Sequence, residues 1–339
     1  MSTHDHLPLG RRRFLTRAAA LTSVLAGVTG EARAEDPPPE TRKIRILHVP
    51  AICHAPQYIA EELLRLEGFT DIEYVQHGAR YIPAALAGAK ADLSMWNAAE
   101  LIPHIEANAA LSVLAGIHGG CFEVFAREDI RSIRDLRGKT VAVTYLGGGD
   151  HLLLASMLAY VGIDPGEVRW LPGTTTLLDA MEIFVSGRAD VYVGFAQQPV
   201  ELRARRIGHV ILDTTTDKPW SQYFCCVLVA NRDFVRRHPV ATKRALRAIL
   251  KAADLCDTAP DAAARFLSAK LYEPRLRIGM EVLEKLEYSR WRDANPEDTI
   301  RFHALRLREV GMIRSQPDRL IAQGVDTRFL LELRRELKS

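Results

Sequence analysis

A glycine-rich loop followed by a helix pattern is the first feature of the sequence that could bind a ligand. Its residues are Gly147-Gly148-Gly149-Asp150-His151. Backbone N–H groups at the start of a helix have no partner within the helix, so they attract an anionic group. The loop lacks the Gly-Lys-Ser/Thr of a phosphate-binding P-loop and the third glycine of a dinucleotide fingerprint. We predict ligand contacts at Gly148, Gly149, Asp150 and His151; the alternative, a flexible turn with Asp150 as helix N-cap, is compatible with them.

A second loop, Cys53-His54-Ala55-Pro56-Gln57, follows the first strand pattern of the chain. His54 could donate a hydrogen bond to an anion or stack against a ring, and Gln57 offers both a donor and an acceptor. A histidine in a loop is also often simply solvated. We include His54 and Gln57 among the predicted ligand contacts.

The remaining candidates follow other predicted strands. Trp96 and Asn97 end one strand, where an aromatic wall and an amide would suit a small polar aromatic ligand. Phe195 and Gln197 hold the matching position later in the chain, and Tyr223 precedes another strand. Thr174 could supply a hydroxyl. Trp96 could equally fill the core, and helix capping is an alternative role for Thr174 and the two threonines after it.

Catalytic and metal motifs are absent from the sequence. There is no G-x-S-x-G elbow and no H-E-x-x-H, and the eleven histidines are scattered. The five cysteines show no C-x-x-C or metal-finger spacing. Cys225 and Cys226 are adjacent in a strand pattern, so we expect their side chains on opposite faces. We predict no catalytic residue, no metal ligand and no cofactor; buried apolar cysteines are expected, and a disulfide of undetermined pairing stays open.

The charge of the chain is concentrated at its N-terminus. The 339 residues are 47% hydrophobic and 26% charged, with a net charge of +3, which is typical of a globular protein. Residues 1–34 hold five arginines and two acidic residues, so the whole excess lies there. The rest is neutral, so neither nucleic-acid binding nor attraction to a charged membrane surface is implied. We also expect no stable membrane insertion.

Residues 1–34 have the pattern of an export signal. Arg11-Arg12-x-Phe14-Leu15 resembles a twin-arginine motif, and an apolar stretch of eleven residues, too short to span a bilayer, follows over 18–28. Ala32-Arg33-Ala34 matches a signal-peptidase site. We predict cleavage near Ala34 and a soluble periplasmic protein; a general secretory peptide and a basic N-terminal arm remain alternatives.

The elements that position these residues occur twice. One β-α-β-α-β pattern spans 43–96 and a second spans 140–195. Their corresponding residues Gly68 and Gly162 lie 94 positions apart, and Asp92 and Asp190 lie 98 apart. Strands alternating with helices predict a mainly parallel sheet in each unit, and ligands bind beyond the carboxyl ends of such strands.

Two further strand patterns, 121–127 and 223–230, flank the second unit where the chain would cross between lobes. We therefore predict lobe 1 as residues 43–120 plus 224–339 and lobe 2 as residues 121–223. From about Pro239 the pattern is helical to the end, and we expect this tail to pack around lobe 1. The hinge is predicted at Gly120–Cys121 and near Tyr223–Cys225.

Several short motifs in this order resemble those of a known family. They are Ala55-Pro56-x-Tyr58-x-Ala60-x-Glu62, Gly187-Arg188-Ala189-Asp190, Gln198-Pro199, Val229-Ala230-Asn231-Arg232-x-Phe234 and His238-Pro239. The layout resembles periplasmic substrate-binding proteins of ABC transporters with the type II fold, in the nitrate/sulfonate/taurine group that includes thiamine-pyrimidine-precursor binding proteins. Where this chain has Gln198, the family often has an acidic residue, which puts charge-dependent selectivity in doubt.

The resemblance implies an α/β fold of two lobes, each a mainly parallel sheet flanked by helices, with a helical C-terminal extension. It also implies a monomeric, non-enzymatic receptor that closes around a small organic ligand of sulfonate, nitrate, pyrimidine or aromatic-acid type. An ABC permease and ATPase would be its partners. One alternative is a pyrimidine-synthase-like enzyme, which would need a cofactor-anchoring lysine and a metal-binding histidine cluster at the cleft. Lys90 and Lys139, however, fall at strand starts, away from the cleft. The other is a ligand-sensing module for a membrane receptor.

Overall fold

The computed structural model describes residues 36–173, 177–270 and 272–337. The predicted export signal, residues 1–34, and Thr174 lie outside the described residues. Of the two compact units into which the chain divides, Pro38–Ser339 holds all the helices and strands given below. None of the helices in the described ranges is long and apolar enough to cross a membrane.

The first sheet has the strand order β2-β1-β3-β10-β4. Its strands are β1 (Lys43–His48), β2 (Asp71–Gln76), β3 (Leu93–Asn97), β4 (Leu111–Gly119) and β10 (Phe224–Asn231). Strand β1 pairs in parallel with β2 and β3, whereas β10 is antiparallel to both β3 and β4. Four of the five strands therefore run in one direction, and the exception is the strand that returns from the second sheet.

The second sheet repeats this arrangement in the order β7-β6-β8-β5-β9. Its strands are β5 (Phe122–Ala126), β6 (Thr140–Val143), β7 (Arg169–Pro172), β8 (Val191–Phe195) and β9 (His209–Asp213). Here β6 is parallel to β7 and β8, and the crossing strand β5 is antiparallel to β8 and β9. The predicted fold class, two α/β lobes built on a repeated unit, is confirmed, with one antiparallel strand in each sheet.

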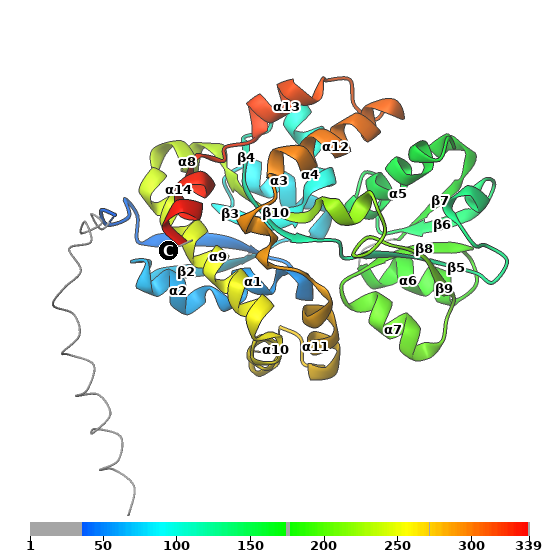
Figure 1. Cartoon of the computed structure of the whole chain (residues 1–339), viewed down its shortest axis with the longest axis horizontal. Coiled ribbons are helices and arrows are strands. Elements are labelled where there is room, and N and C mark those ends of the chain that lie inside the picture. Colours follow the sequence, from blue (N-terminus) through cyan, green and yellow to red (C-terminus); the bar gives the residue numbers. More distant parts are fainter. Residues whose placement is uncertain (1–35, 174–176, 271, 338–339) are drawn as a thin grey trace, which may run out of the picture. The chain divides into compact units, whose positions relative to one another are not determined.

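Helices flank both sheets (Figure 1). Those before β10 are α1 (Ala55–Ile59), α2 (Glu61–Leu66), α3 (Ile82–Ala87), α4 (Ala98–Glu106), α5 (Gly149–Tyr160), α6 (Leu177–Val185) and α7 (Gln197–Arg205). Those after it are α8 (Arg232–Arg237), α9 (Pro239–Thr258), α10 (Pro260–Ala269), α11 (Leu276–Lys285), α12 (Pro296–Glu309), α13 (Pro317–Gly324) and α14 (Arg328–Leu337). Short 3-10 turns include η1 (Ile52–His54) and η5 (Trp220–Gln222).

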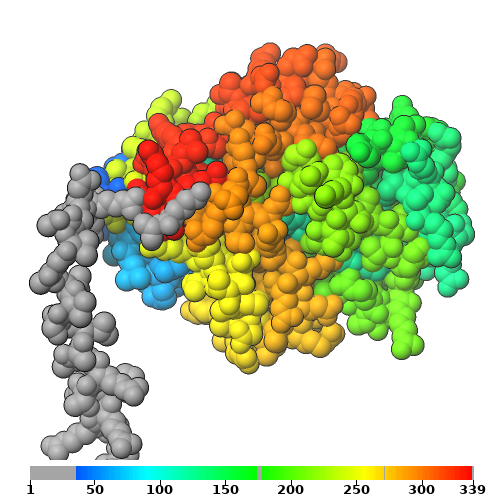
Figure 2. All heavy atoms as spheres, in the orientation of Figure 1, coloured from blue at the N-terminus to red at the C-terminus, as the bar shows by residue number. Residues whose placement is uncertain are grey.

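The C-terminal helices pack around lobe 1, as predicted, and they also contact lobe 2. Helix α9 packs on α1 and α2, but α11 packs on α7 and α12 on α5. Figure 2 shows these helices, yellow to orange, meeting the green second lobe at the surface. A buried carboxylate, Glu123 of β5, joins this contact through ion pairs with Arg203 of α7 and Lys285 of α11. The contact with lobe 2 was not predicted, because helical periodicity indicates which face of a helix is apolar but not which lobe covers that face.

The aspartate of each repeated unit has a structural role. The Asp92 carboxylate accepts a hydrogen bond from the Arg45 backbone N–H at 2.8 Å, and that of Asp190 accepts one from the Thr140 N–H at 2.7 Å. Each aspartate precedes the third strand of its unit and so fastens that strand to the first one. The sequence motif therefore recurs because the two sheets need the same fastening.

The first crossing between the sheets depends on Gly120, which lies between β4 and β5. A Cβ atom there would lie 2.2 Å from the backbone carbonyl carbon of Thr214, on the returning segment after β9. No side chain fits at that distance, so the two connections can approach this closely only with glycine at position 120.

Candidate functional site

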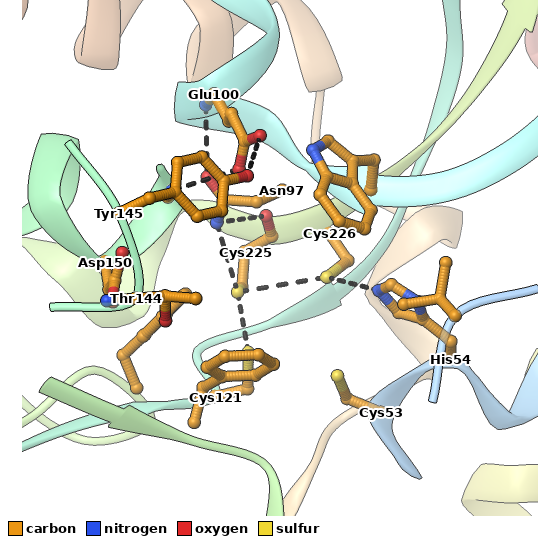
Figure 3. Close-up of a pocket in the computed structure, with 15 residues that line it drawn as sticks. Cys53, His54, Asn97, Glu100, Cys121, Thr144, Tyr145, Asp150, Cys225 and Cys226 are labelled. Atoms are coloured by element: carbon orange, nitrogen blue, oxygen red, sulfur yellow. Dashed lines mark hydrogen bonds between the residues drawn. The ribbon is translucent and has the colours of Figure 1, made fainter. Parts of the chain in front are cut away.

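A pocket lies between the carboxyl ends of the two sheets, with an empty volume of about 540 Å³ that is partly open to solvent. Six of the twelve predicted ligand contacts line it: His54, Trp96, Asn97, Gly149, Asp150 and Phe195. Nine further lining residues were not predicted, and six of them bear on the chemistry of the pocket: Cys53, Glu100, Cys121, Tyr145, Cys225 and Cys226. Figure 3 shows how side chains from both sheets converge on this space.

Helix α4 begins at the pocket because Asn97 caps it. The Asn97 side chain accepts a hydrogen bond from the Glu100 N–H at 3.1 Å, and its amide donates to the Cys225 carbonyl at 3.4 Å. Helix α5 of the other lobe begins directly opposite, since a Cβ at Gly149 would lie 2.8 Å from the Asn97 side chain. The two helix N-termini, each with partial positive charge, therefore face one another across the pocket.

Two predicted contacts serve the structure of a single lobe. Gln57 is fully buried and joins β1 to β3, donating to the Leu47 carbonyl and accepting from the Met95 N–H, both at 3.0 Å. His151 accepts a hydrogen bond from the Gly147 N–H at 3.1 Å and packs edge-on against Trp170. Burial lowers the pKa of His151 to about 4, so the imidazole is neutral at pH 7.

The other predicted residues lie outside the pocket lining. Gln197 of lobe 2 donates to the Pro50 carbonyl of lobe 1 at 3.2 Å, so it links the lobes. Tyr223 stacks on Phe302 of α12, with ring centroids 3.9 Å apart. Gly148 is the N-cap residue of α5 and donates to the Tyr145 carbonyl at 3.1 Å.

The glycine-rich loop already holds a carboxyl group, and that group belongs to the protein. The Glu100 carboxyl accepts a hydrogen bond from the Gly149 N–H at 3.0 Å, and the Tyr145 hydroxyl donates to its other oxygen at 2.5 Å. The Asp150 carboxylate accepts from the Thr144 N–H and the His151 N–H. The loop donors that we expected to hold a ligand anion are therefore directed to these two side chains.

Burial raises the pKa of both carboxyls. Glu100 is 4% exposed, and burial raises its pKa to about 8, against the opposing effect of the Tyr145 hydrogen bond. Burial also raises the pKa of Asp150, although the Thr144 and His151 N–H groups lower it in part. At neutral pH Glu100 is consequently protonated for the most part, and the lobes meet across a largely uncharged hydrogen bond.

Two polar atoms of the lining are left free for a ligand. Within the described part of the chain, neither Nε1 of Trp96 nor Nδ1 of His54 has a hydrogen-bond partner, and both residues are buried. The indole is nonetheless close enough to Glu100 to lower the pKa of that carboxyl somewhat. Buried polar atoms are normally paired, so these two are candidates for ligand recognition.

Four of the five cysteines gather at the pocket, and all five are buried with free thiols. The prediction that Cys225 and Cys226 point to opposite faces is wrong, because both line the pocket. The β10–β4 pairing shifts register on both sides of Cys226, and such a bulge turns a side chain out of the alternating pattern. Their Sγ atoms lie 4.0 Å apart, and the Cys225 Sγ lies 2.7 Å from that of Cys121.

The unpredicted residues share a reason for having been missed. Glu100 sits in the first turn of a helix, where an acidic residue usually only favours the helix dipole. Its function as a link between lobes depends on Tyr145 and Gly149, 45 and 49 positions away. One signal was available: Glu100 follows the strand end at Trp96-Asn97 by a single helical turn, so it was bound to lie near the cleft.

The fold is shared with solved periplasmic binding proteins. The nitrate-binding protein NrtA from Synechocystis PCC 6803 superposes with a TM-score of 0.74 at 14% identity, covering 89% of this chain and 90% of that one. The alkanesulfonate-binding protein SsuA from Xanthomonas axonopodis pv. citri, bound to MOPS, gives 0.68 at 16%, covering 87% and 100%. The aliphatic sulphonate binding protein SsuA from Escherichia coli gives 0.63 at 19%, covering 85% and 91%.

Sequence similarity identifies the family more directly than these distant structures do. No curated protein sequence matches the chain significantly. The profile of the family described as NMT1/THI5 like, however, matches residues 53–263, a span that includes every pocket residue except Val49. This match covers more than half of the 339 residues, and the protein therefore belongs to the NMT1/THI5-like family.

Proposed function

We propose that the protein is the periplasmic solute-binding component of an ABC importer, exported by residues 1–34, and that it delivers a small organic molecule to a permease and its ATPase. The observation that carries this proposal is the pocket itself, whose walls come from both lobes at the point where the chain crosses between them. A ligand that contacts both lobes at once stabilises the closed arrangement, and release requires the lobes to separate. The proposed export is supported by the sequence pattern of residues 1–34, and the proposed partners are supported by the family resemblance.

The lining points to an uncharged or positively charged ligand. Among the described residues that line the pocket there is no lysine or arginine, whereas Glu100 and Asp150 are both present. A buried nitrate or sulfonate would have no charged partner here and would lie beside two carboxyls. Of the ligand types suggested by the family resemblance, a neutral pyrimidine fits best. A ring nitrogen of a pyrimidine can accept a hydrogen bond from Trp96 Nε1, and the ring itself can pack against Phe195.

A pyrimidine-synthase-like enzyme is the second candidate, and the lining gives it less support. Such chemistry needs a lysine that can form a Schiff base with its cofactor. None of the fifteen lining residues within the described ranges is a lysine. A sensing module for a membrane receptor would use the same pocket, so only the presence of permease and ATPase genes beside this one separates it from a transport component.

Thermal-shift screening tests the proposal. The purified protein is heated with neutral pyrimidines, organic amines, aromatic acids, sulfonates and nitrate, and small-angle scattering then follows closure with any compound that stabilises. A ligand at about 100 times its Kd adds about 2.7 kcal/mol to the free energy of unfolding. Stabilisation by nitrate or sulfonates alone would refute the ligand class. No stabilisation by any compound, with no change in scattering, would refute the receptor function.

A matched pair of tryptophan variants tests the recognition. Trp96→Phe keeps an aromatic wall but removes the indole N–H, so we expect about a five-fold weaker affinity, equivalent to about 1 kcal/mol. Trp170→Phe is the control, since its indole already donates to the Pro165 carbonyl away from the pocket. Equal affinity in Trp96→Phe and the native protein would mean that Trp96 only fills space.

A further inference from the structure

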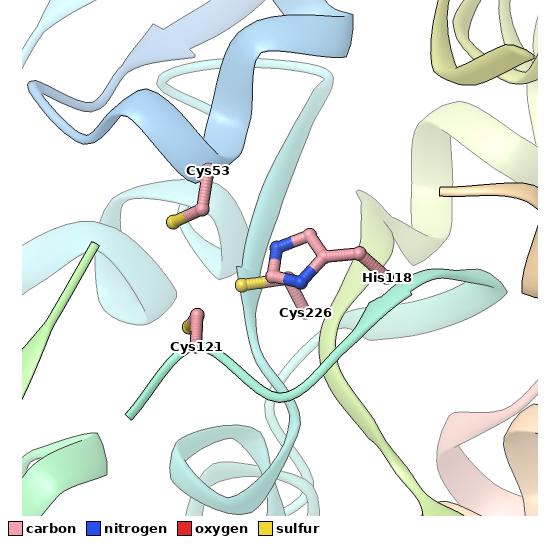
Figure 4. A group of neighbouring side chains, drawn as sticks. All are labelled: Cys53, His118, Cys121 and Cys226. Atoms are coloured by element: carbon pink, nitrogen blue, oxygen red, sulfur yellow. The ribbon is translucent and has the colours of Figure 1, made fainter. Parts of the chain in front are cut away.

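Four side chains from separate segments converge beside the pocket with the composition of a metal site. They are Cys53 in η1, His118 in β4, Cys121 at the first crossing and Cys226 in β10. One ligand atom from each lies within 4.8 Å of all the others, and all four residues are buried (Figure 4). The sequence could not show this set, because its members are three to 173 residues apart along the chain and follow no metal-finger spacing.

The imidazole of His118 is held as a metal-bound imidazole usually is. Its Nδ1 lies 2.7 Å from the Gly119 carbonyl oxygen, so Nδ1 carries the proton and donates it there. Nε2 is then left as a bare acceptor, and it has no hydrogen-bond partner in the described part of the protein, although His118 is fully buried. A backbone carbonyl that fixes the ring in this way is the ordinary second partner of a histidine ligand. Figure 4 shows the ring turned toward the three sulfurs.

The distances fit a tetrahedral zinc ion. Zinc bonds of about 2.3 Å to sulfur and about 2.0 Å to nitrogen place the ligand atoms of a tetrahedron about 3.6–3.8 Å apart. The observed limit of 4.8 Å requires each side chain to move inward by less than about 1 Å. Thiolates disfavour magnesium and calcium, which take oxygen ligands, and three cysteines with one histidine form a known set for zinc.

We propose that Cys53, His118, Cys121 and Cys226 bind one Zn²⁺ ion. Three of these residues also line the pocket, so the ion would lie in its wall and be reached through it. It would tie the segment after β1 to both strands that run between the lobes. This proposal does not depend on the proposed transport function.

A competing arrangement exists within the same group of thiols. The Cys225 Sγ lies 2.7 Å from the Cys121 Sγ, so oxidation of this pair would remove one zinc ligand. A zinc-loaded protein should therefore resist thiol oxidants at Cys121, whereas the metal-free protein should form the Cys121–Cys225 disulfide when an added disulfide reagent accepts the two electrons and protons.

Metal binding by the intact protein is the test. The reduced, chelator-treated protein is titrated with Zn²⁺ against a chromophoric chelator, and bound zinc is counted by elemental analysis. We expect one ion per chain, and Co²⁺ in its place should show thiolate-to-cobalt absorption and the strong visible bands of a tetrahedral site. Cys53→Ser, His118→Gln, Cys121→Ser and Cys226→Ser should each weaken zinc binding by about 100-fold or more.

Two cysteines supply controls. Cys256→Ala removes a buried thiol of α9 outside the cluster, and Cys225→Ser removes the neighbouring thiol; both should leave zinc affinity within about three-fold. Losses as large as those of the four ligand variants would overturn the assignment, as would less than half an ion per chain. If a variant of one of the four zinc ligands fails to fold, the cobalt spectrum of the native protein tests the proposal instead. A spectrum without absorption from sulfur coordination would refute the site.

Discussion

Protonation of Glu100 should couple the stability of the protein to pH. Its pKa rises from 4.5 to about 8 because the closed pocket buries the carboxyl. The folded protein therefore keeps this proton when the unfolded chain has lost it, so the stabilising contribution is complete below about pH 4.5 and declines up to about pH 8. Each pH unit within that range is worth about 1.4 kcal/mol, which gives a loss of about 3 to 4 kcal/mol between pH 5 and pH 8.

Glu100→Gln isolates this contribution, because glutamine keeps the shape and an acceptor for the Gly149 N–H but does not titrate. Urea unfolding of the native protein and the variant, followed by circular dichroism from pH 5 to pH 8, gives the difference in unfolding free energy. The native protein should lose about 3 to 4 kcal/mol relative to the variant across this range. Burial lowers the pKa of His151 and of His303 to about 4, so these histidines make the protein more stable as the pH rises. Their contribution is the same in the native protein and in the variant, and it therefore cancels when the two unfolding free energies are subtracted.

Glu106→Gln is the matched control on the same helix. Its carboxylate accepts from the Ser315 and Arg314 N–H groups, which lower its pKa, so it stays ionised throughout the range and its variant should show a flat difference. If the lobes separate as the pH rises, water reaches Glu100 and the loss of unfolding free energy is smaller. Small-angle scattering would then show that the native protein expands with pH whereas Glu100→Gln does not. A flat difference together with unchanged scattering would refute the role assigned to Glu100.

Three further substitutions test how the lobes are built, each measured by urea unfolding at pH 7. Gly120→Ala should cost about 2 kcal/mol or more, because its Cβ would overlap the Thr214 backbone. Asp190→Ala should cost about 1 to 2 kcal/mol, because the Thr140 N–H loses its acceptor. Glu123→Ala should cost about 1 to 3 kcal/mol. This cost is lower than that for a fully buried ion pair, because both basic partners of the buried carboxylate are partly exposed.

Each of these substitutions has a control of the same residue type. Gly279→Ala in α11 meets only ordinary contacts and should be neutral or stabilising. Asp129→Ala removes an exposed ion pair of the second lobe, and Glu281→Ala removes the more exposed partner of Arg203; each should cost less than about 1 kcal/mol. If a control costs as much as its counterpart, the cause assigned to that counterpart is wrong.

The sequence predicted the fold well because the fold depends on local signals. Alternating strands, glycine-terminated helices and the paired Asp92 and Asp190 repeat at a nearly constant spacing, and each signal has a physical cause within its own unit. The candidate site was predicted only in part. A side chain near a strand end can turn into the pocket, as that of Trp96 in β3 does, and one in a following helix can turn back into its lobe, as that of Gln57 in α1 does. The sequence carries no information on that choice.

Contacts between distant segments were the ones that sequence reasoning missed. The cysteines near the crossing follow no motif, since the crossing strands and not the local sequence bring them together. A bulge at Cys226 added to the error by turning both adjacent thiols to one side. Spacing rules for metal sites assume ligands on one loop or hairpin, so they do not apply to a site assembled from four segments.

Glu100 also explains how a fold shared with anion receptors could serve an uncharged ligand. The facing N-termini of α4 and α5 form a place where an anion is favourable, and here the side chain of Glu100 occupies it. An anionic ligand would have to displace a carboxyl that is already hydrogen-bonded to Tyr145 and Gly149 and then leave that carboxyl buried without these partners. A neutral ligand requires no such exchange, because it can use the unpaired atoms of Trp96 and His54 while Glu100 remains in place. Glu100→Ala should consequently open the helix termini to anions, and stabilisation of that variant by nitrate or a sulfonate, absent in the native protein, is the result that this reasoning requires.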